Sequence, residues 1–261
     1  EGTHDRFPRW FELGTVAICF GTRPEIIKLA PLIKLLGDSA RLIHTGQHFD
    51  DGLSRRILSD LGVQAPRINL GVGGTSRVAQ IGHAMAAAEP HLSDCEAVVV
   101  QGDTNSALAG GLAANAIDLP LFHVEAGLRS PDRRMPEEHN RVLIDHLADV
   151  CWAPTEVNVE NLARERIGDA RVRLTGNSIV EALESILPAQ DDAMQVLRGL
   201  GLEPRKYVLA TLHRPENVDD PEQLKAAMKA LSDLPLPVVF PVHTRTAASL
   251  ERHGLEERQE G

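Results

Sequence analysis

Short apolar runs alternate with segments of helical periodicity along most of the chain. Apolar runs predict strands at 16–20, 41–45, 98–100, 121–124, 150–153 and 172–174. The segments between them place apolar residues at helical spacing and predict helices at 26–36, 76–89, 105–117, 137–147 and 155–166. Residues 60–76 are rich in glycine and are predicted to form a loop. Strand and helix alternate through residue 187, which indicates a doubly wound α/β domain with a parallel sheet.

A second α/β segment is predicted after a polar linker at 188–192. It has helices at 194–200, 222–231 and 246–252 and strands at 207–211 and 238–240. The expected organisation is an N-terminal extension at 1–15, a Rossmann-like domain at 16–187, and a partial Rossmann-like domain at 188–261. Two strands are few for an open sheet, so the second domain is expected to be incomplete in this chain.

Acidic residues follow the predicted strands. Asp103 comes after the run at 98–100, Glu125 follows the run at 121–124 directly, and Glu137 comes directly after Pro136. Because the carboxyl ends of parallel strands face one crevice, we expect these acids to converge there. Taken one at a time, Asp103 is also explained as a helix cap, and Glu137 as a first-turn acid that complements a helix dipole.

Basic and amide side chains also follow the carboxyl ends of predicted strands. Arg23 and Lys28 belong to the turn and helix behind the first strand, where anionic groups are favoured and where Thr22 is a candidate cap. They are equally explained as two solvated charges on a first turn. The other strand-end candidates are Gln47, His48, Arg129, Arg141, Asn177, His213, Arg214 and His243. Carboxylates that act as acid and base, together with cations for a phosphate, indicate an enzyme that moves protons on a phosphorylated metabolite.

Composition excludes several other classes. The formal net charge is −10 and aromatic residues make up 3% of the chain, which argues against a nucleic-acid binder. The three cysteines are far apart and show no ligand spacing, so we expect buried free thiols in a reducing cytoplasm and neither a disulfide nor a structural zinc. No apolar run approaches the roughly 20 residues that span a bilayer, so no membrane association is expected.

Nine motifs together resemble one enzyme family, the non-hydrolysing UDP-N-acetylglucosamine 2-epimerases. They are GTRPEIIKLAPL (21–32), TGQH (45–48), VQGDTNS (100–106), HVEAGLRS (123–130), MPEEHNR (135–141), APTE (153–156), TGNSIVEAL (175–183), TLHRPENVDD (211–220) and PVHTRT (241–246). The resemblance implies two Rossmann-like domains of GT-B type. It also implies interconversion of UDP-GlcNAc and UDP-ManNAc without a cofactor or metal, through elimination of UDP to 2-acetamidoglucal and its re-addition.

Matching the motifs residue by residue implies roles for this chain. The catalytic set is Asp103, Glu125, Glu137 and His213, the last of them near the diphosphate. The implied substrate-binding residues are Arg23, Lys28, Gln47, His48, Thr104, Arg129, Asn140, Arg141, Asn177, Arg214 and His243. The resemblance further implies UDP-GlcNAc or UDP as the ligand, a cytoplasmic homodimer, and a place in cell-envelope polysaccharide biosynthesis.

Three alternatives stay open on sequence. A hydrolysing epimerase of the same fold releases ManNAc and UDP. An epimerase for another sugar nucleotide, such as a diacetamido uronic acid, shares the same motifs. A truncated, non-catalytic nucleotide-sugar binding protein fits the short C-terminal segment.

Overall fold

The computed structural model describes residues 14–47 and 57–255. The chain divides into two compact units, Glu1–Leu187 and Pro188–Gly261. Within the described residues, the longest apolar helices are too short to cross a lipid bilayer.

The first unit is built on a seven-stranded parallel sheet of order β3-β2-β1-β4-β5-β6-β7. The strands are β1 (Val16–Phe20), β2 (Ala40–His44), β3 (Ile68–Asn69), β4 (Ala97–Gln101), β5 (Leu121–Val124), β6 (Val150–Ala153) and β7 (Val172–Leu174). The strand order reverses between β1 and β4, which are direct neighbours. In a doubly wound sheet, this reversal opens a crevice at the carboxyl ends of the strands, where ligands bind.

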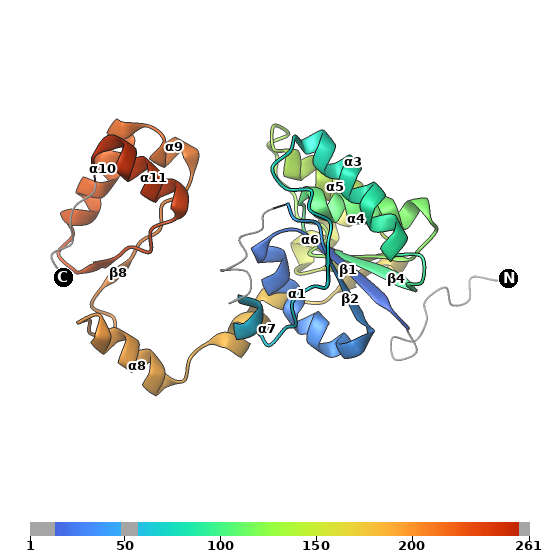
Figure 1. Ribbon diagram of the computed structural model, residues 1–261, viewed down its shortest axis with the longest axis horizontal. Helices are drawn as coiled ribbons and strands as arrows, with labels where there is room; N and C mark the ends of the chain where they lie inside the picture. The colour runs from blue at the N-terminus through green and yellow to red at the C-terminus, as the bar shows by residue number, and fades with distance from the viewer. Residues whose placement is uncertain (1–13, 48–56, 256–261) are drawn as a thin grey trace. The chain divides into compact units, whose positions relative to one another are not determined.

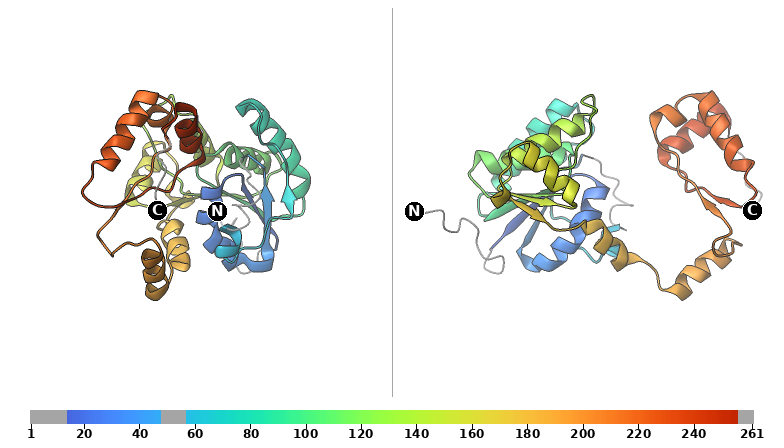
Figure 2. Two further views of the ribbon diagram at one scale, coloured as in Figure 1. Left: turned by 60° about the vertical axis from the view of Figure 1, so that its left-hand side comes forward. Right: turned by 180° about the vertical axis from the view of Figure 1, so that it is seen from behind.

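Helices cover both faces of this sheet (Figures 1 and 2). One face carries α1 (Arg23–Leu36) and α7 (Ser178–Ile186), which pack against each other. The other face carries α3 (Arg77–Ala88), α4 (Asn105–Ala116), α5 (Pro136–Leu147) and α6 (Glu156–Arg164). Because β1 and β4 are covered on both sides, all five residues of each are buried, and their sequences are nearly continuous apolar runs.

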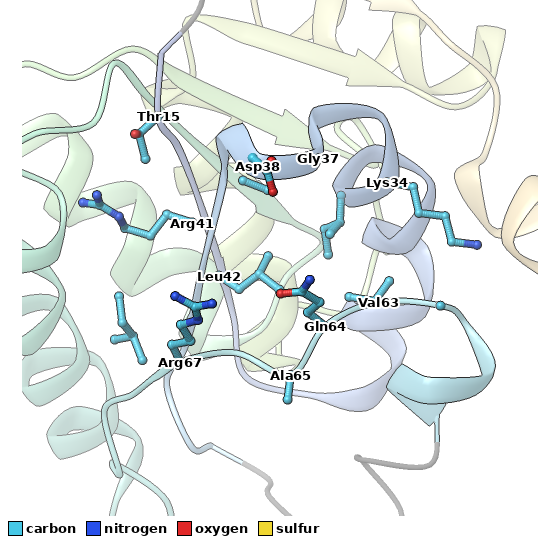
Figure 3. A pocket seen from close by; sticks show the side chains of 14 residues that line it. Thr15, Lys34, Gly37, Asp38, Arg41, Leu42, Val63, Gln64, Ala65 and Arg67 are labelled. Carbon is cyan, nitrogen blue, oxygen red and sulfur yellow. The ribbon is translucent and has the colours of Figure 1, made fainter.

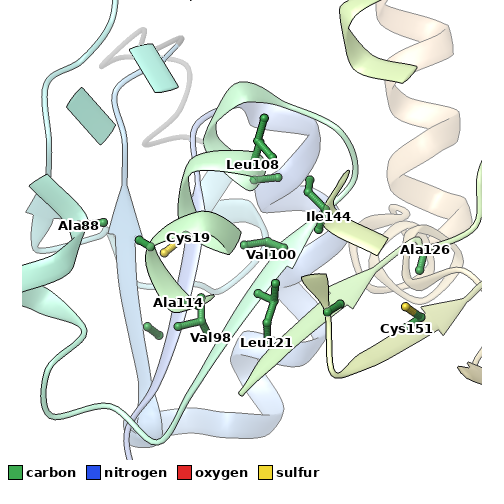
Figure 4. Packing of buried hydrophobic residues seen from close by; sticks show 14 of the residues in the cluster. Cys19, Ala88, Val98, Val100, Leu108, Ala114, Leu121, Ala126, Ile144 and Cys151 are labelled. Carbon is green, nitrogen blue, oxygen red and sulfur yellow. The ribbon is translucent and has the colours of Figure 1, made fainter. Parts of the chain in front are cut away.

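The core under α4 depends on small residues (Figure 4). A side-chain carbon added at Gly110 would lie 2.7 Å from Cβ of Cys19 in β1, so glycine permits the close approach of helix and sheet. Cys19, Cys95 and Cys151 are buried free thiols, as the sequence predicts. Burial raises the pKa of Cys19 and Cys151 to about 12, which keeps both thiols protonated and unreactive at neutral pH.

The second unit contains a two-stranded parallel sheet. Its elements are α8 (Gln190–Gly199), β8 (Val208–Leu209), α9 (Pro215–Val218), α10 (Pro221–Ser232), β9 (Val238–Val239) and α11 (Thr244–His253). Its buried apolar cluster is Val218, Leu224 and Leu250. Both strands are shorter than predicted, and the segment at Pro215, for which no helix is predicted, forms the single turn α9.

Two predictions from the sequence were wrong. The stretch at 188–192 is not all linker, because α8 begins at Gln190 and takes Asp191 and Asp192 into its first turn. Carboxylates are favourable there because they face the positive end of the helix dipole. The predicted loop at 60–76 contains β3, which pairs Ile68 with Ile43 of β2. A two-residue strand is too short for periodicity to reveal.

Candidate active site

A pocket of about 230 Å³ lies at the carboxyl ends of β1, β4 and β5, where the strand order reverses. The lining residues are Thr22, Pro24, Glu25, Lys28, Gln101, Gly102, Asp103, Thr104, Glu125, Leu128 and Arg141. Five of the predicted site residues therefore meet in one small volume. They are Lys28, Asp103, Thr104, Glu125 and Arg141.

Asp103 is held by two neighbouring residues of α5. Its carboxylate accepts a hydrogen bond from Nη2 of Arg141, and its backbone carbonyl accepts one from Nδ2 of Asn140 at 2.8 Å. Nη1 of Arg141 donates to Glu138 Oε2 at 3.0 Å. Because Arg141 is only 7% exposed, its charge lies in a poorly hydrated place and is balanced by two carboxylates.

Glu125 follows β5 and forms the second pair. Its Oε2 lies 2.5 Å from Nζ of Lys28 in α1 and also accepts a hydrogen bond from Gln101. The backbone of Glu125 has φ +68°, a left-handed conformation that costs roughly 1 kcal/mol or more in a residue with a side chain. Such strain concentrates at functional sites, where the surrounding structure holds it in place.

Glu25 is a pocket residue that the sequence prediction missed. Only 1% of it is exposed, and its carboxylate accepts from the backbone N–H of Gly21 at 3.1 Å, from Thr22 Oγ1 at 2.7 Å and from Thr104 Oγ1 at 2.8 Å. Burial raises its pKa to about 7, and these hydrogen bonds offset only part of that effect. Thr22 occupies the N-cap position of α1, as the sequence predicts. Its hydroxyl does not accept a hydrogen bond from a backbone N–H of the first turn, however, but donates one to Glu25. A threonine three residues before a glutamate is the pattern of a capping box, and that signal marks Glu25.

Several predicted residues of the first unit lie outside the pocket lining. Gln47 accepts hydrogen bonds from the backbone and hydroxyl of Ser106, and Asn177 caps α7 through the N–H of Ile179. Arg129 is engaged by Asp145 and Glu165. The side chain of Arg23 forms no hydrogen bond or ion pair with any residue in the described ranges, 14–47 and 57–255. His48 lies outside those ranges.

Glu137 and Glu138 are separated by the geometry of α5. Both occupy its first turn, but Glu137 is exposed and does not line the pocket, whereas Glu138 is buried and binds Arg141. Glu138 also accepts from the backbone N–H of Ser130 at 2.9 Å. The sequence signal for Glu138 is its spacing on the helix, since Glu138, Arg141 and Asp145 recur at three and four residues and are all buried.

The three predicted residues of the second unit also lie near one another. The ring centroids of His213 and His243 are 5.7 Å apart, and Arg214 lies beside Glu216 at 3.8 Å. His243 is the N-cap of α11, where its Nδ1 accepts from the N–H of Arg245 at 3.2 Å. This unit therefore presents imidazole and guanidinium groups around β8 and β9.

A larger cavity of about 570 Å³ lies at the other end of the sheet, at the start of β1, β2 and β3 (Figure 3). Lys34, Arg41 and Arg67 line it together with the single acid Asp38. Arg41 is bound by both carboxylate oxygens of Asp94. Although this cavity is larger, its lining includes neither Asp103 nor Glu125, which lie at the opposite end of the sheet.

Among the His, Cys, Asp and Glu side chains at 14–47 and 57–255, no three are grouped so that they could hold a metal ion. The chemistry visible in the crevice is that of two carboxylate–cation pairs and one buried carboxyl group.

Comparison with known proteins places this geometry in a family. Residues 37–259 match the family model for UDP-N-acetylglucosamine 2-epimerase. The chain belongs to this family. It is 38% identical over 249 residues to the UDP-N-acetylglucosamine 2-epimerase of Methanococcus maripaludis, covering 92% of this chain and 68% of that protein. It is 36% identical over 251 residues to the UDP-2,3-diacetamido-2,3-dideoxy-D-glucuronate 2-epimerase of Pseudomonas aeruginosa, covering 90% of this chain and 68% of that protein.

Solved structures agree with the fold. The UDP-GlcNAc 2-epimerase of Methanocaldococcus jannaschii, in complex with UDP-GlcNAc and UDP, is 36% identical and superimposes with a TM-score of 0.72. That likeness covers 92% of this chain and 69% of the solved chain. It confirms the predicted fold class, α/β with Rossmann-like units of GT-B type, and this chain spans about two thirds of the length of these relatives.

Proposed function

We propose that this protein is a UDP-N-acetylglucosamine 2-epimerase that interconverts UDP-GlcNAc and UDP-ManNAc. The observation that carries the proposal is the pair of carboxylate–cation contacts in the crevice, Asp103 with Arg141 and Glu125 with Lys28. Carboxylates accept and return protons, and cations stabilise a departing diphosphate, so this set fits the removal and return of UDP. Membership of the family and the names of the relatives support the same reaction.

The proposed reaction balances through proton transfers alone. A carboxylate takes the proton from C2 of the sugar, the C1–O bond breaks, and its electron pair leaves with UDP. The C–H electrons form the C1–C2 double bond of 2-acetamidoglucal. A proton then returns to the opposite face of C2 as an oxygen of UDP forms the C1–O bond again. The scheme requires no cofactor.

The residue roles stay part of the proposal. Asp103, Glu125 and Glu137 form the proton-handling set, and His213 of the second unit acts near the diphosphate. The substrate-binding set, supported by the motif match, comprises Arg23, Lys28, Gln47, His48, Thr104, Arg129, Asn140, Arg141, Asn177, Arg214 and His243. The resemblance also supports a cytoplasmic homodimer that supplies cell-envelope polysaccharide synthesis.

Deuterium exchange tests the reaction. Incubation of the protein with UDP-GlcNAc in heavy water should place deuterium at C2 of both recovered sugar nucleotides. The substitution Asp103→Asn removes a proton carrier and should slow this exchange by at least about 100-fold. Asp38→Asn, at the opposite end of the sheet, is the matched control and should exchange at the wild-type rate. Failure of the wild-type protein to exchange C2 would exclude the proposal, and accumulation of free ManNAc with UDP would favour the hydrolysing alternative.

A second sugar is supported by one specific comparison. The P. aeruginosa relative, whose name specifies a diacetamido glucuronate nucleotide, is nearly as similar to this chain as the M. maripaludis protein. The ratio of kcat/KM for the two nucleotides decides between them, because each is epimerised at C2. A ratio that favours the glucuronate would transfer the assignment to that sugar.

A further inference from the structure

His123 is a fully buried histidine in β5 whose two ring nitrogens both face acceptors. Its Nε2 lies 2.8 Å from the backbone carbonyl of Gly102, and its Nδ1 lies 2.6 Å from Oδ1 of Asp145 in α5. Both side chains are 0% exposed. A carbonyl oxygen can only accept, so Nε2 carries a proton and donates it to Gly102.

The state of Asp145 decides the other nitrogen. Its Oδ2 lies 2.7 Å from Nη1 of Arg129 and accepts from the backbone N–H of Gly127 at 3.1 Å, so a cation and a second donor face this carboxyl group besides His123. The carboxylate is therefore ionised and can only accept. It follows that Nδ1 of His123 also donates, and that the two side chains form a buried ion pair.

This pair binds the backbone on both sides of the crevice. Through His123 it holds the carbonyl of Gly102, the residue before Asp103. Through Oδ2, Asp145 accepts from the N–H of Gly127, two residues after Glu125, at 3.1 Å. Gly102 and Gly127 have φ of +70° and +79°. Each loop therefore adopts the left-handed backbone conformation at the residue that His123 or Asp145 binds.

The two loops also meet each other. The N–H of Gly102 donates to the carbonyl of Val124 at 3.0 Å. A side-chain carbon added at Gly102 would lie 3.8 Å from Oε2 of Glu125. A small shift of either loop would therefore change the separation of the Asp103 and Glu125 carboxylates, which line one pocket.

We propose that the His123–Asp145 ion pair is a positioning device that holds Asp103 and Glu125 at the separation the proposed epimerase reaction needs. Neither residue lines the pocket, so both are positioning residues and have no contact with the sugar. Arg129, which binds Asp145 at 2.7 Å and Glu165 at 2.6 Å, completes the charge balance on the outer side of the pair. The inference rests on the proposed function for its catalytic consequence and on hydrogen bonding alone for the ion pair.

Nuclear magnetic resonance of the full chain with ¹⁵N-labelled histidine tests the ion pair without any substrate. One of the 11 histidines should show two slowly exchanging ring N–H protons at neutral pH, and this signal should vanish in His123→Gln. A single ring proton on His123 would overturn the ion pair. This outcome is independent of whether the protein epimerises any sugar.

Kinetics of Asp145→Asn test the positioning role. The variant should lose about 10- to 100-fold in kcat for C2 exchange, because misplaced catalytic groups are costly. Its KM should stay within about threefold of the wild-type value, because no contact with the substrate is removed. Asp149→Asn is the matched control, since Asp149 also accepts from a backbone N–H, that of Leu121 at the first residue of β5, whereas Asp145 accepts from Gly127 beyond the last residue of that strand. It should retain wild-type kcat.

Two outcomes separate the inference from the proposed function. Wild-type protein without C2 exchange would refute the epimerase and leave the resonance experiment to test the ion pair. Active wild-type protein with an undiminished kcat in a folded Asp145→Asn variant would refute the positioning role. If that variant does not fold, kcat for C2 exchange by His123→Gln tests the positioning role in the same way, and an undiminished kcat in that variant would refute it.

Discussion

At the scale of single residues, the carboxyl groups of the crevice are of two kinds, those that contact a cation and one that is buried without such a contact among the described residues. Asp103 and Glu125 each contact a cation, whereas Glu25 is enclosed by hydroxyl and backbone donors and pairs with no cation among residues 14–47 and 57–255. Desolvation therefore dominates at Glu25 and raises its pKa to about 7, from an ordinary value of 4.5. The same pocket thus holds two carboxylates that contact cations and one buried carboxyl group whose pKa is raised to about 7.

The titration of Glu25 makes stability depend on pH. Between about pH 4.5 and pH 7 the folded protein retains a proton that the unfolded chain has released, so the free energy of unfolding falls as pH rises. Over that interval the loss from this group amounts to about 3 kcal/mol. Above pH 7 the loss is complete.

We therefore expect Glu25→Gln to gain stability relative to the wild type as pH rises. The difference in unfolding free energy between the two proteins should shift by about 3 kcal/mol in favour of the variant between pH 4.5 and pH 7.5. Urea titrations followed by fluorescence of Trp152, which lies in β6, measure it. An equal difference at both pH values would contradict the assigned titration.

At the scale of elements, the turn after β5 combines unusual backbone with close packing. Gly127 has φ +79°, and a side-chain carbon added there would lie 2.4 Å from the backbone carbonyl of Asn158 in α6. The turn thus brings Glu125 into the crevice and α6 against the sheet at the same point. Only glycine satisfies both requirements.

Gly127→Ala should destabilise the first unit by at least about 2 kcal/mol, because it adds both a clash and a strained φ. Gly82→Ala in α3 is the matched control, since the added carbon there meets open space inside a helix. That control should be more stable than the wild type by about 0.5–1 kcal/mol. Unfolding midpoints of the two variants that move in the same direction would refute the role of Gly127.

At the scale of the whole molecule, each unit has its own core. The three buried clusters around the seven-stranded sheet consist of residues before Leu187, and the cluster of Val218, Leu224 and Leu250 belongs to the second unit. We propose a domain boundary between Leu187 and Pro188 on this basis. The proposed catalytic set is divided between the two units, with the three acids in the first and His213 in the second.

A protein that ends at Leu187 should therefore fold but not react. Its unfolding free energy, followed at Trp152, should lie within about 1 kcal/mol of the value for the full chain, because no core contact is removed. C2 exchange should be absent, because His213, Arg214 and His243 are missing. A shortened protein that unfolds at a much lower urea concentration would argue against the boundary.

The sequence by itself determined the alternation of strands and helices, the strand ends that carry Asp103 and Glu125, and the family to which the chain belongs. These follow from local periodicity and from motifs, which are readable over a few residues. Only the tertiary structure decided which side chains meet. Lys28 and Glu125 are 97 residues apart in the chain and touch because β1, β4 and β5 lie side by side. Three other features arise in the same way: the burial of Glu25, the exposure of Glu137 and the pairing of His123 with Asp145. The order of the strands and the face that each helix turns to the sheet are set by the packing of the whole unit.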